Sequence, residues 1–213
     1  MDTKFWHEKW ENNQIAFHAS EANPFLVKYF GVLKLSKQRR VFLPLCGKTL
    51  DISFLLSLGY RIAGAELVEK AVRELFDQLC LKPSVTPYGS LKRYSAGSVD
   101  IFAGDIFQLT PEILGPVDAV YDRAALVALP QEMRSRYTSH LKTLAPKKPQ
   151  FMITYEYDQS KMDGPPFSIS EEEIRRHYQD VYRVMRFESA DVVGGIRGCP
   201  ATENVWLLKP SSL

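Results

Sequence analysis

The sequence of 213 residues has few of the residues from which disulfides and metal sites are built. It contains three cysteines and four histidines, with neither a C-x-x-C pair nor an H-E-x-x-H arrangement. An odd number of scattered cysteines does not predict a disulfide framework. The spacing of the histidines does not predict a zinc site either. We therefore expect no bound metal ion.

Long apolar runs and an excess of one charge are also missing. No apolar run reaches the roughly 18 residues of a membrane span, and the N-terminus lacks the apolar core of a signal peptide. The net charge is only +2, which indicates no attraction to nucleic acid or to a membrane. Hydrophobic residues make up 45% and charged residues 24%, as in globular proteins. We expect a cytoplasmic protein with one domain over residues 1–213.

Residues 41–66 (VFLPLCGKTLDISFLLSLGYRIAGAE) have the pattern strand, turn, helix and strand, and they end on the acid Glu66. Apolar residues recur at helical spacing over 50–58, and Gly59 ends that helix. Glu66 follows Gly47 at close to the spacing of about 20 residues that is typical of an acid that binds ribose hydroxyls. The alternative is an ordinary βαβ unit with a solvated glutamate at the end of a strand.

The turn after the first of these strands distinguishes between nucleotides. A dinucleotide needs closely spaced glycines, G-x-G-x-x-G, so that backbone N–H groups approach its pyrophosphate. The turn Leu45-Cys46-Gly47-Lys48-Thr49 has one glycine, and Phe42 stands where a phosphate-binding loop of the form G-x-x-x-x-G-K-[ST] requires another. This pattern favours a ligand with ribose and adenine but no phosphate, of which S-adenosylmethionine is the common one. Cys46 is expected to be a small buried residue rather than a nucleophile.

Apolar runs and helical spacings alternate along the rest of the chain. The alternation predicts an α/β fold with a parallel sheet covered on both faces, and the C-terminal pair of runs predicts an antiparallel strand. Ser168 or Ser170 is expected to cap the helix that ends at Tyr178, where three glutamates occupy the first turn. Strands are expected near 41–45, 62–65, 91–94, 99–102, 117–121, 151–157, 182–188 and 203–208, and helices near 24–30, 50–58, 71–82, 130–144 and 170–178.

The N-terminal segment is too rich in aromatic residues to be a solvated tail. Trp6 and Trp10 share one face of a predicted helix that Asn12-Asn13 ends, and Pro24 can start a second helix. The segment is either a helical cap on the sheet or a lid over a bound ligand.

Several motifs together resemble the thiopurine S-methyltransferase family, especially its bacterial members, over nearly the whole length. The resemblance implies a class I methyltransferase (Rossmann-like) fold, with a seven-stranded, mostly parallel sheet, an antiparallel last strand and an N-terminal helical lid over 1–33. The motifs are FWHEKWENNQIAFH (5–18), VFLPLCGKTLD (41–51), GAELVEKAV (64–72), GDIF (104–107), YDRAALVALP (121–130) and GPPFSIS (164–170).

The resemblance also implies roles for individual residues in binding S-adenosylmethionine. Trp10 resembles the tryptophan that closes over the cofactor, and Leu45 resembles the leucine that contacts it from the strand-end turn. Glu66 resembles the ribose-binding acid, and Asp105 and Ile106 resemble the pair at the adenine edge. Arg123 in D-R-x-A-L resembles the arginine that meets the bound molecule.

On the substrate side, Phe17 resembles the aromatic residue at the substrate opening, and Arg123 is again a candidate. Arg197 lies in a glycine-rich loop that suits a substrate-facing arginine. The family motif D-R-G-A-L is here D-R-A-A-L, so Ala124 adds a methyl group beside the site.

The implied reaction is methylation of the sulfur of an aromatic or heterocyclic thiol of the thiopurine type, with selenium or tellurium compounds as further acceptors. A thiolate is already nucleophilic, so the enzyme needs proximity and in-line orientation more than a base. Arg123 would favour the thiolate because a nearby cation lowers the pKa of a thiol. Asp122 could accept a proton, but a structural role at the strand end is favoured.

Two other functions share parts of this pattern. A nicotinamide-dependent reductase would use Glu66 but lacks its glycines, and a non-enzymatic cofactor-binding module would keep Glu66 and the aromatic residues. We expect a monomer that acts on a small-molecule thiol, without nucleic-acid or membrane partners.

Overall fold

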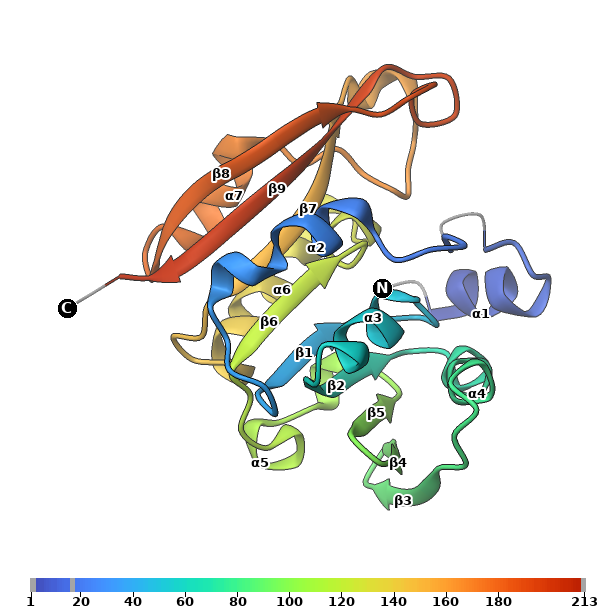
Figure 1. Ribbon diagram of the computed structural model, residues 1–213. Coiled ribbons are helices and arrows are strands. Elements are labelled where there is room, and N and C mark those ends of the chain that lie inside the picture. Colours follow the sequence, from blue (N-terminus) through green and yellow to red (C-terminus); the bar gives the residue numbers. More distant parts are fainter. Residues whose placement is uncertain (1–2, 16–17, 212–213) are drawn as a thin grey trace. The chain divides into compact units, whose positions relative to one another are not determined.

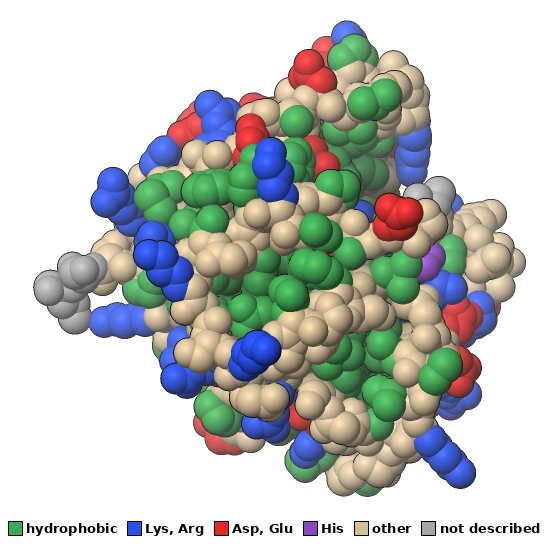
Figure 2. Space-filling view, viewed as in Figure 1, with side chains coloured by type: hydrophobic (Ala, Val, Ile, Leu, Met, Phe, Trp, Pro, Cys, Tyr) green, Lys and Arg blue, Asp and Glu red, His purple; other side chains and the backbone are tan. Residues whose placement is uncertain are grey.

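The computed structural model describes residues 3–15 and 18–211, which fall into two compact units, Asp2–Asp118 and Ala119–Leu213 (Figure 1). Phe17, the candidate at the substrate opening, lies outside the described residues. Lys and Arg side chains are scattered over the face shown in Figure 2 rather than gathered into one block. No helix in the described part of the chain is long and apolar enough to cross a membrane.

The N-terminal unit is built on five strands in the order β3-β4-β5-β2-β1. Strands β1, β2 and β5 run parallel and are almost completely buried, which explains why each reads as a nearly continuous apolar run. Strands β3 and β4 form an antiparallel hairpin at the edge of this sheet. The strands are β1 (Arg40–Pro44), β2 (Arg61–Glu66), β3 (Ser84–Tyr88), β4 (Leu91–Ala96) and β5 (Val99–Ala103).

Helices connect and cover these strands (Figure 1). One face of α4 is buried through Ala71, Val72, Leu75 and Phe76, and α4 also contacts β2, β5 and α1. The N-terminus of α2 is capped by Asn23, whose side chain accepts hydrogen bonds from the amides of residues 25 and 26. The helical elements are α1 (Thr3–Glu11), α2 (Pro24–Tyr29), η1 (Phe30–Leu33), α3 (Asp51–Ser57), α4 (Glu69–Gln78), η2 (Ile106–Gln108) and α5 (Pro111–Leu114).

The C-terminal unit has four strands in the order β6-β7-β9-β8. Strand β6 is parallel to β7, whereas β9 is antiparallel to β7 and to β8. Helix α7 contacts α6 and β8. The elements are β6 (Ala119–Arg123), η3 (Leu126–Ala128), α6 (Gln131–Leu144), β7 (Gln150–Tyr157), η4 (Gln159–Lys161), α7 (Glu171–Tyr178), β8 (Tyr182–Asp191) and β9 (Ala201–Pro210).

The alternating helices and strands and the antiparallel last strand are confirmed, but the number of strands differs from the expected seven. The two units together contain nine described strands. Eight of them match the strand ranges expected from the residues, and the ninth is β3, because residues 84–96 form a hairpin where only one strand, near 91–94, was expected. Strand β3 is mostly exposed and contains Pro87, so it has no apolar alternation of its own. It exists through its pairing with β4, as is typical of an edge strand.

Candidate functional site

The carboxyl ends of β1, β2 and β5 meet at one edge of the N-terminal unit. After β1 the chain turns through Leu45 and Gly47, both of which have a positive φ, +46° and +53°. The amide of Cys46 donates to the carbonyl of Ala65 at 3.0 Å, which attaches the turn to β2. A leucine in the left-handed region is strained, and such strain is concentrated at functional sites. The burial of Cys46 raises the pKa of its thiol, so the expectation of an inert buried cysteine agrees with its position.

Glu66 at the end of β2 holds this turn in place. Its side chain is 6% exposed and accepts hydrogen bonds from the amides of Gly47 and Val68, each at 2.8 Å. Burial raises the pKa of Glu66, and the backbone hydrogen bonds partly oppose that rise. Each carboxylate oxygen keeps acceptor capacity beyond these bonds. Glu66 therefore combines a structural role, which the sequence did not indicate, with the ability to accept hydroxyl hydrogen bonds.

Trp10 packs over the same turn. It is buried in a cluster with Val68 and Ala71, and a Cβ atom at Gly47 would lie 3.3 Å from its ring. The ammonium group of Lys48 is 5.9 Å from the centre of the Trp10 ring, and Lys70 donates to the Trp10 carbonyl at 2.8 Å. The turn therefore needs glycine at position 47 both for its backbone conformation and for the close approach of this indole.

Asp105 and Ile106 follow β5, the neighbour of β2. The exposed Asp105 accepts a hydrogen bond from the amide of Phe107 at 3.0 Å and so caps η2, whereas Ile106 is buried. The amide of Gly104 donates to the carbonyl of Glu66 at 2.8 Å, which joins the ends of the two strands. The structure thus brings Trp10, Leu45, Glu66, Asp105 and Ile106 to the carboxyl edge of one unit.

Asp122 and Arg123 end β6 in the C-terminal unit. Asp122 is completely buried and accepts hydrogen bonds from the Leu126 amide at 3.2 Å and the Tyr137 hydroxyl at 2.8 Å. Burial raises the pKa of Asp122 to about 6, although both hydrogen bonds lower it. The carboxyl group connects the turn after β6 to α6, which supports the structural role favoured from the sequence.

Arg123 has neighbours that sequence reasoning missed. Tyr155 on β7 and Glu203 on β9 are paired across the strands. Burial raises the pKa of Tyr155 and the charge of Glu203 raises it further, whereas the charge of Arg123 lowers it. The cluster of Arg123, Tyr155 and Glu203 sets the electrostatics at this strand end. The three residues are far apart in sequence. The only signal for them in the sequence is the alternation of side-chain direction along β7 and β9.

Arg197 lies in the loop between β8 and β9. It is exposed, has a φ of +50°, and donates a hydrogen bond from Nη2 to the carbonyl of Pro165 at 3.0 Å. This contact links the glycine-rich loop to the GPPFSIS segment (164–170). The same loop and Glu156 line a shallow cavity of about 450 Å³.

Comparison with known proteins identifies the family. The model of the family described as Thiopurine S-methyltransferase (TPMT) matches residues 1–205. The chain belongs to this family. It is 53% identical over 211 residues to a thiopurine S-methyltransferase of Xanthobacter autotrophicus, with 98% of this chain and 99% of the relative covered. It is 44% identical over 215 residues to that of Gluconobacter oxydans, with 99% and 98% covered.

Solved structures show the same fold at low sequence identity. The 1,6-didemethyltoxoflavin N1-methyltransferase of Burkholderia thailandensis, with bound 1,6-didemethyltoxoflavin and S-adenosylhomocysteine, is 15% identical with a TM-score of 0.68, and the match covers 99% of this chain and 87% of that one. The magnesium protoporphyrin IX methyltransferase of Synechocystis is 16% identical with a TM-score of 0.63, covering 98% and 100%. The class I methyltransferase fold is confirmed. As a member of its family the chain is an S-adenosylmethionine-dependent methyltransferase.

One departure from the family motif has a structural consequence. Ala124 stands where the resemblance described above implies glycine, and its φ is +63°. This conformation favours glycine, because a Cβ atom there crowds the backbone. The substitution leaves the turn after Arg123 strained but formed.

Proposed function

We propose that this methyltransferase transfers the methyl group of S-adenosylmethionine to the sulfur of an aromatic or heterocyclic thiol. The observation that carries the proposal is the arrangement of three neighbouring parts. The buried carboxylate of Glu66 lies beside the single-glycine turn at Gly47, and the indole of Trp10 packs over that turn. It suits ribose and adenine without phosphate. The thiopurine S-methyltransferases that resemble the chain support a thiol as the acceptor.

Each residue of the N-terminal edge has a role in this proposal. Glu66 accepts hydrogen bonds from the ribose hydroxyls, and Asp105 accepts one from the adenine amine beside the apolar side chain of Ile106. Leu45 contacts the cofactor from the turn. Trp10 anchors the N-terminal segment, residues 1–33, as a lid, and its contacts with Val68 and Ala71 hold that lid next to the turn.

Arg123 acts on the acceptor. When bound, S-adenosylmethionine supplies an electrophilic methyl group on a positively charged sulfur. The guanidinium of Arg123 lowers the pKa of the acceptor thiol, so the thiolate is present at neutral pH without a side-chain base. Tyr155 and Glu203 orient Arg123 from the neighbouring strands. Asp122 is already engaged by Leu126 and Tyr137 and takes no part in proton transfer. Phe17 and Arg197 are proposed to contact the substrate.

The acceptor class is tested with labelled S-adenosylmethionine and a panel of aromatic thiols, heterocyclic thiols, and selenium and tellurium oxyanions. We expect transfer to the heterocyclic thiols, and transfer to the oxyanions would widen the acceptor class. Tight cofactor binding without transfer to any of these acceptors would show that the acceptor belongs to another chemical class and would contradict the proposal.

The position of the ribose is tested by calorimetric titration of S-adenosylhomocysteine into the Glu66→Ala variant. We expect binding to weaken by roughly 1–3 kcal/mol, the cost of leaving buried hydroxyl groups unpaired. Asp77→Ala removes the same charge from an exposed position of the same unit, outside the proposed lid, and should bind as the wild type does. Thermal unfolding of both variants separates lost binding from lost folding, since Glu66 also holds the turn. Unchanged affinity of a folded Glu66→Ala variant would show that the ribose lies elsewhere.

A further inference from the structure

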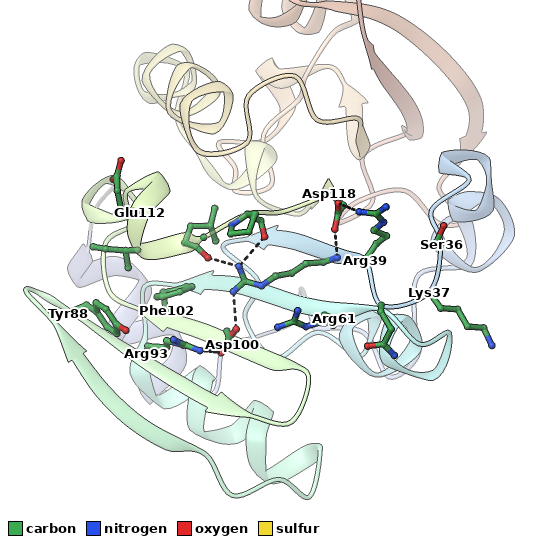
Figure 3. A pocket seen from close by; sticks show the side chains of 16 residues that line it. Ser36, Lys37, Arg39, Arg61, Tyr88, Arg93, Asp100, Phe102, Glu112 and Asp118 are labelled. Atoms are coloured by element: carbon green, nitrogen blue, oxygen red, sulfur yellow. Dashed lines mark hydrogen bonds and ion pairs between the residues drawn. The ribbon is translucent and has the colours of Figure 1, made fainter.

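A second cavity lies at the opposite edge of the N-terminal unit from the proposed cofactor site. It measures about 810 Å³ and is bounded by the first residues of β1 and β2, by β5 and by the segment 112–118 (Figure 3). Arg61 begins β2, whereas Glu66 ends it, so the length of the strand separates the two sites. This cavity is not used by the proposed methyl transfer.

Three arginines from three strands, Arg40, Arg61 and Arg93, lie on one face of the sheet here. Arg40 on β1 and Arg61 on β2 are direct partners across the parallel strands, and strand alternation puts Asp100 on the same face as Arg61. Figure 3 shows Arg61 and Arg93 on either side of Asp100. Like charges at directly paired positions repel each other. The sheet therefore keeps an arrangement of arginines that is unfavourable unless negative charge is nearby.

One carboxylate supplies most of that negative charge. Asp100 accepts hydrogen bonds from Arg40 at 2.9 Å and from Arg93 at 2.8 and 3.0 Å, so two guanidinium groups share it. Burial lowers the pKa of Arg40, and the positive charges of Arg61 and Arg93 lower it further against the effect of Asp100. Asp118 is paired with Arg39 at 3.1 Å.

The charges that line the cavity do not balance. Five basic and three acidic side chains line it, which leaves an excess of two positive charges. Arg61 is exposed, and the structure records no hydrogen bond or ion pair for its guanidinium group within the described residues. It lies on the same face of the sheet as Asp100 and remains available to a ligand.

We propose that this cavity binds a small molecule that carries a phosphate group, with Arg61 as its principal ligand. A phosphate group carries a charge of about −1.5 to −2, which matches the excess of positive charge among the side chains that line the cavity. Arginine binds phosphate through two parallel hydrogen bonds. A single carboxylate would leave half of the excess positive charge uncompensated. Tyr88 also lines the cavity and offers an aromatic surface to the organic part of such a ligand.

The proposal is tested by calorimetric titration of inorganic pyrophosphate and of phenyl phosphate, which contain no adenosine and so do not mimic the methyl donor. We expect both to bind the wild-type protein and Arg61→Ala to weaken both by about tenfold or more. Arg61→Lys should recover part of the affinity, because it restores the charge but not the planar pair of donors. Tighter binding of phenyl phosphate than of pyrophosphate would point to an aromatic phosphate ester, and the reverse order to an inorganic ligand.

The matched control is Arg183→Ala, which removes another exposed arginine, from β8 in the other unit. It has the same effect on net charge and should bind both probes as the wild type does. Circular dichroism should show that Arg61→Ala is folded, because the change removes a repulsion with Arg40. Absence of binding to the wild type, or equal weakening in the Arg61→Ala and Arg183→Ala variants, would overturn the proposal.

Discussion

At the scale of the residue, Ala124 carries a strain that a smaller residue would remove. Its φ of +63° lies in the left-handed region, which costs a residue with a Cβ atom roughly 1–2 kcal/mol. We expect Ala124→Gly to raise the free energy of unfolding by about 0.5–1 kcal/mol, since the relief exceeds the extra entropy of glycine in the unfolded chain. Urea denaturation measures this change in the free energy of unfolding. Ala128→Gly in η3 serves as the control and should lower the stability; a similar loss in Ala124→Gly would contradict the argument.

Asp122 is expected to make stability depend on pH. Burial raises its pKa from 3.8 to about 6 in the folded chain, so between these values the folded state holds a proton that the unfolded state has lost. The stabilising effect of that proton is fully present below the unfolded pKa and disappears as the pH rises through the folded pKa.

The measurement compares the wild type with Asp122→Asn, which cannot titrate at this position. From about pH 4 to pH 7, the wild-type free energy of unfolding should fall by roughly 2–3 kcal/mol relative to the variant. Urea titrations at several pH values give this difference. A difference that stayed constant, or that rose with pH, would show that Asp122 is ionised in the folded chain.

At the scale of the element, α7 depends on its cap. Of the two serines that the sequence offered, Ser170 is the N-cap: its hydroxyl accepts a hydrogen bond from the amide of Glu173 at 3.2 Å. Ser168 instead accepts from the amide of Tyr157 at 3.0 Å and so attaches the preceding loop to β7. The choice between them depended on where β7 passes, which the local sequence does not contain.

Removal of the cap should therefore weaken α7. We expect Ser170→Ala to lower the free energy of unfolding by about 1 kcal/mol, since it leaves the Glu173 amide without its partner. Ser139→Ala makes the same change at an exposed position inside α6, where alanine is the better helix former, and should change stability little or raise it. Equal effects of the two substitutions in chemical denaturation would argue against the capping role.

At the scale of the whole molecule, the exposed apolar surface predicts a monomer. The large hydrophobic residues exposed in the described part of the chain come from separate segments of both units: Val27, Leu58, Val85, Phe187 and Val193. Such single side chains are ordinary on a monomer. We expect sedimentation equilibrium at micromolar concentration to give a mass near 24.3 kDa. A mass of twice that value, independent of salt, would contradict this prediction.

The amino-acid sequence by itself determined the α/β class, most of the strands and helices and the candidate residues at the strand ends. The physical reason is that each depends on local information: apolar periodicity, capping residues and the spacing from Gly47 to Glu66 within one strand–turn–helix–strand unit. The confirmed antiparallel β9 was also implied locally, because a short loop between two strand-like runs favours antiparallel pairing.

The tertiary structure alone decided which side chains meet. Three contacts depend on the pairing register between strands that are distant in sequence: Glu66 accepts from the Gly47 amide, Tyr155 interacts with both Arg123 and Glu203, and two arginines share Asp100. Hydrophobic periodicity shows which face of a strand is buried, but it does not show which residue of another strand lies opposite. For the same reason the hairpin of β3 and β4 became visible only through its pairing, and the cavity lined by Arg61 only through the fold.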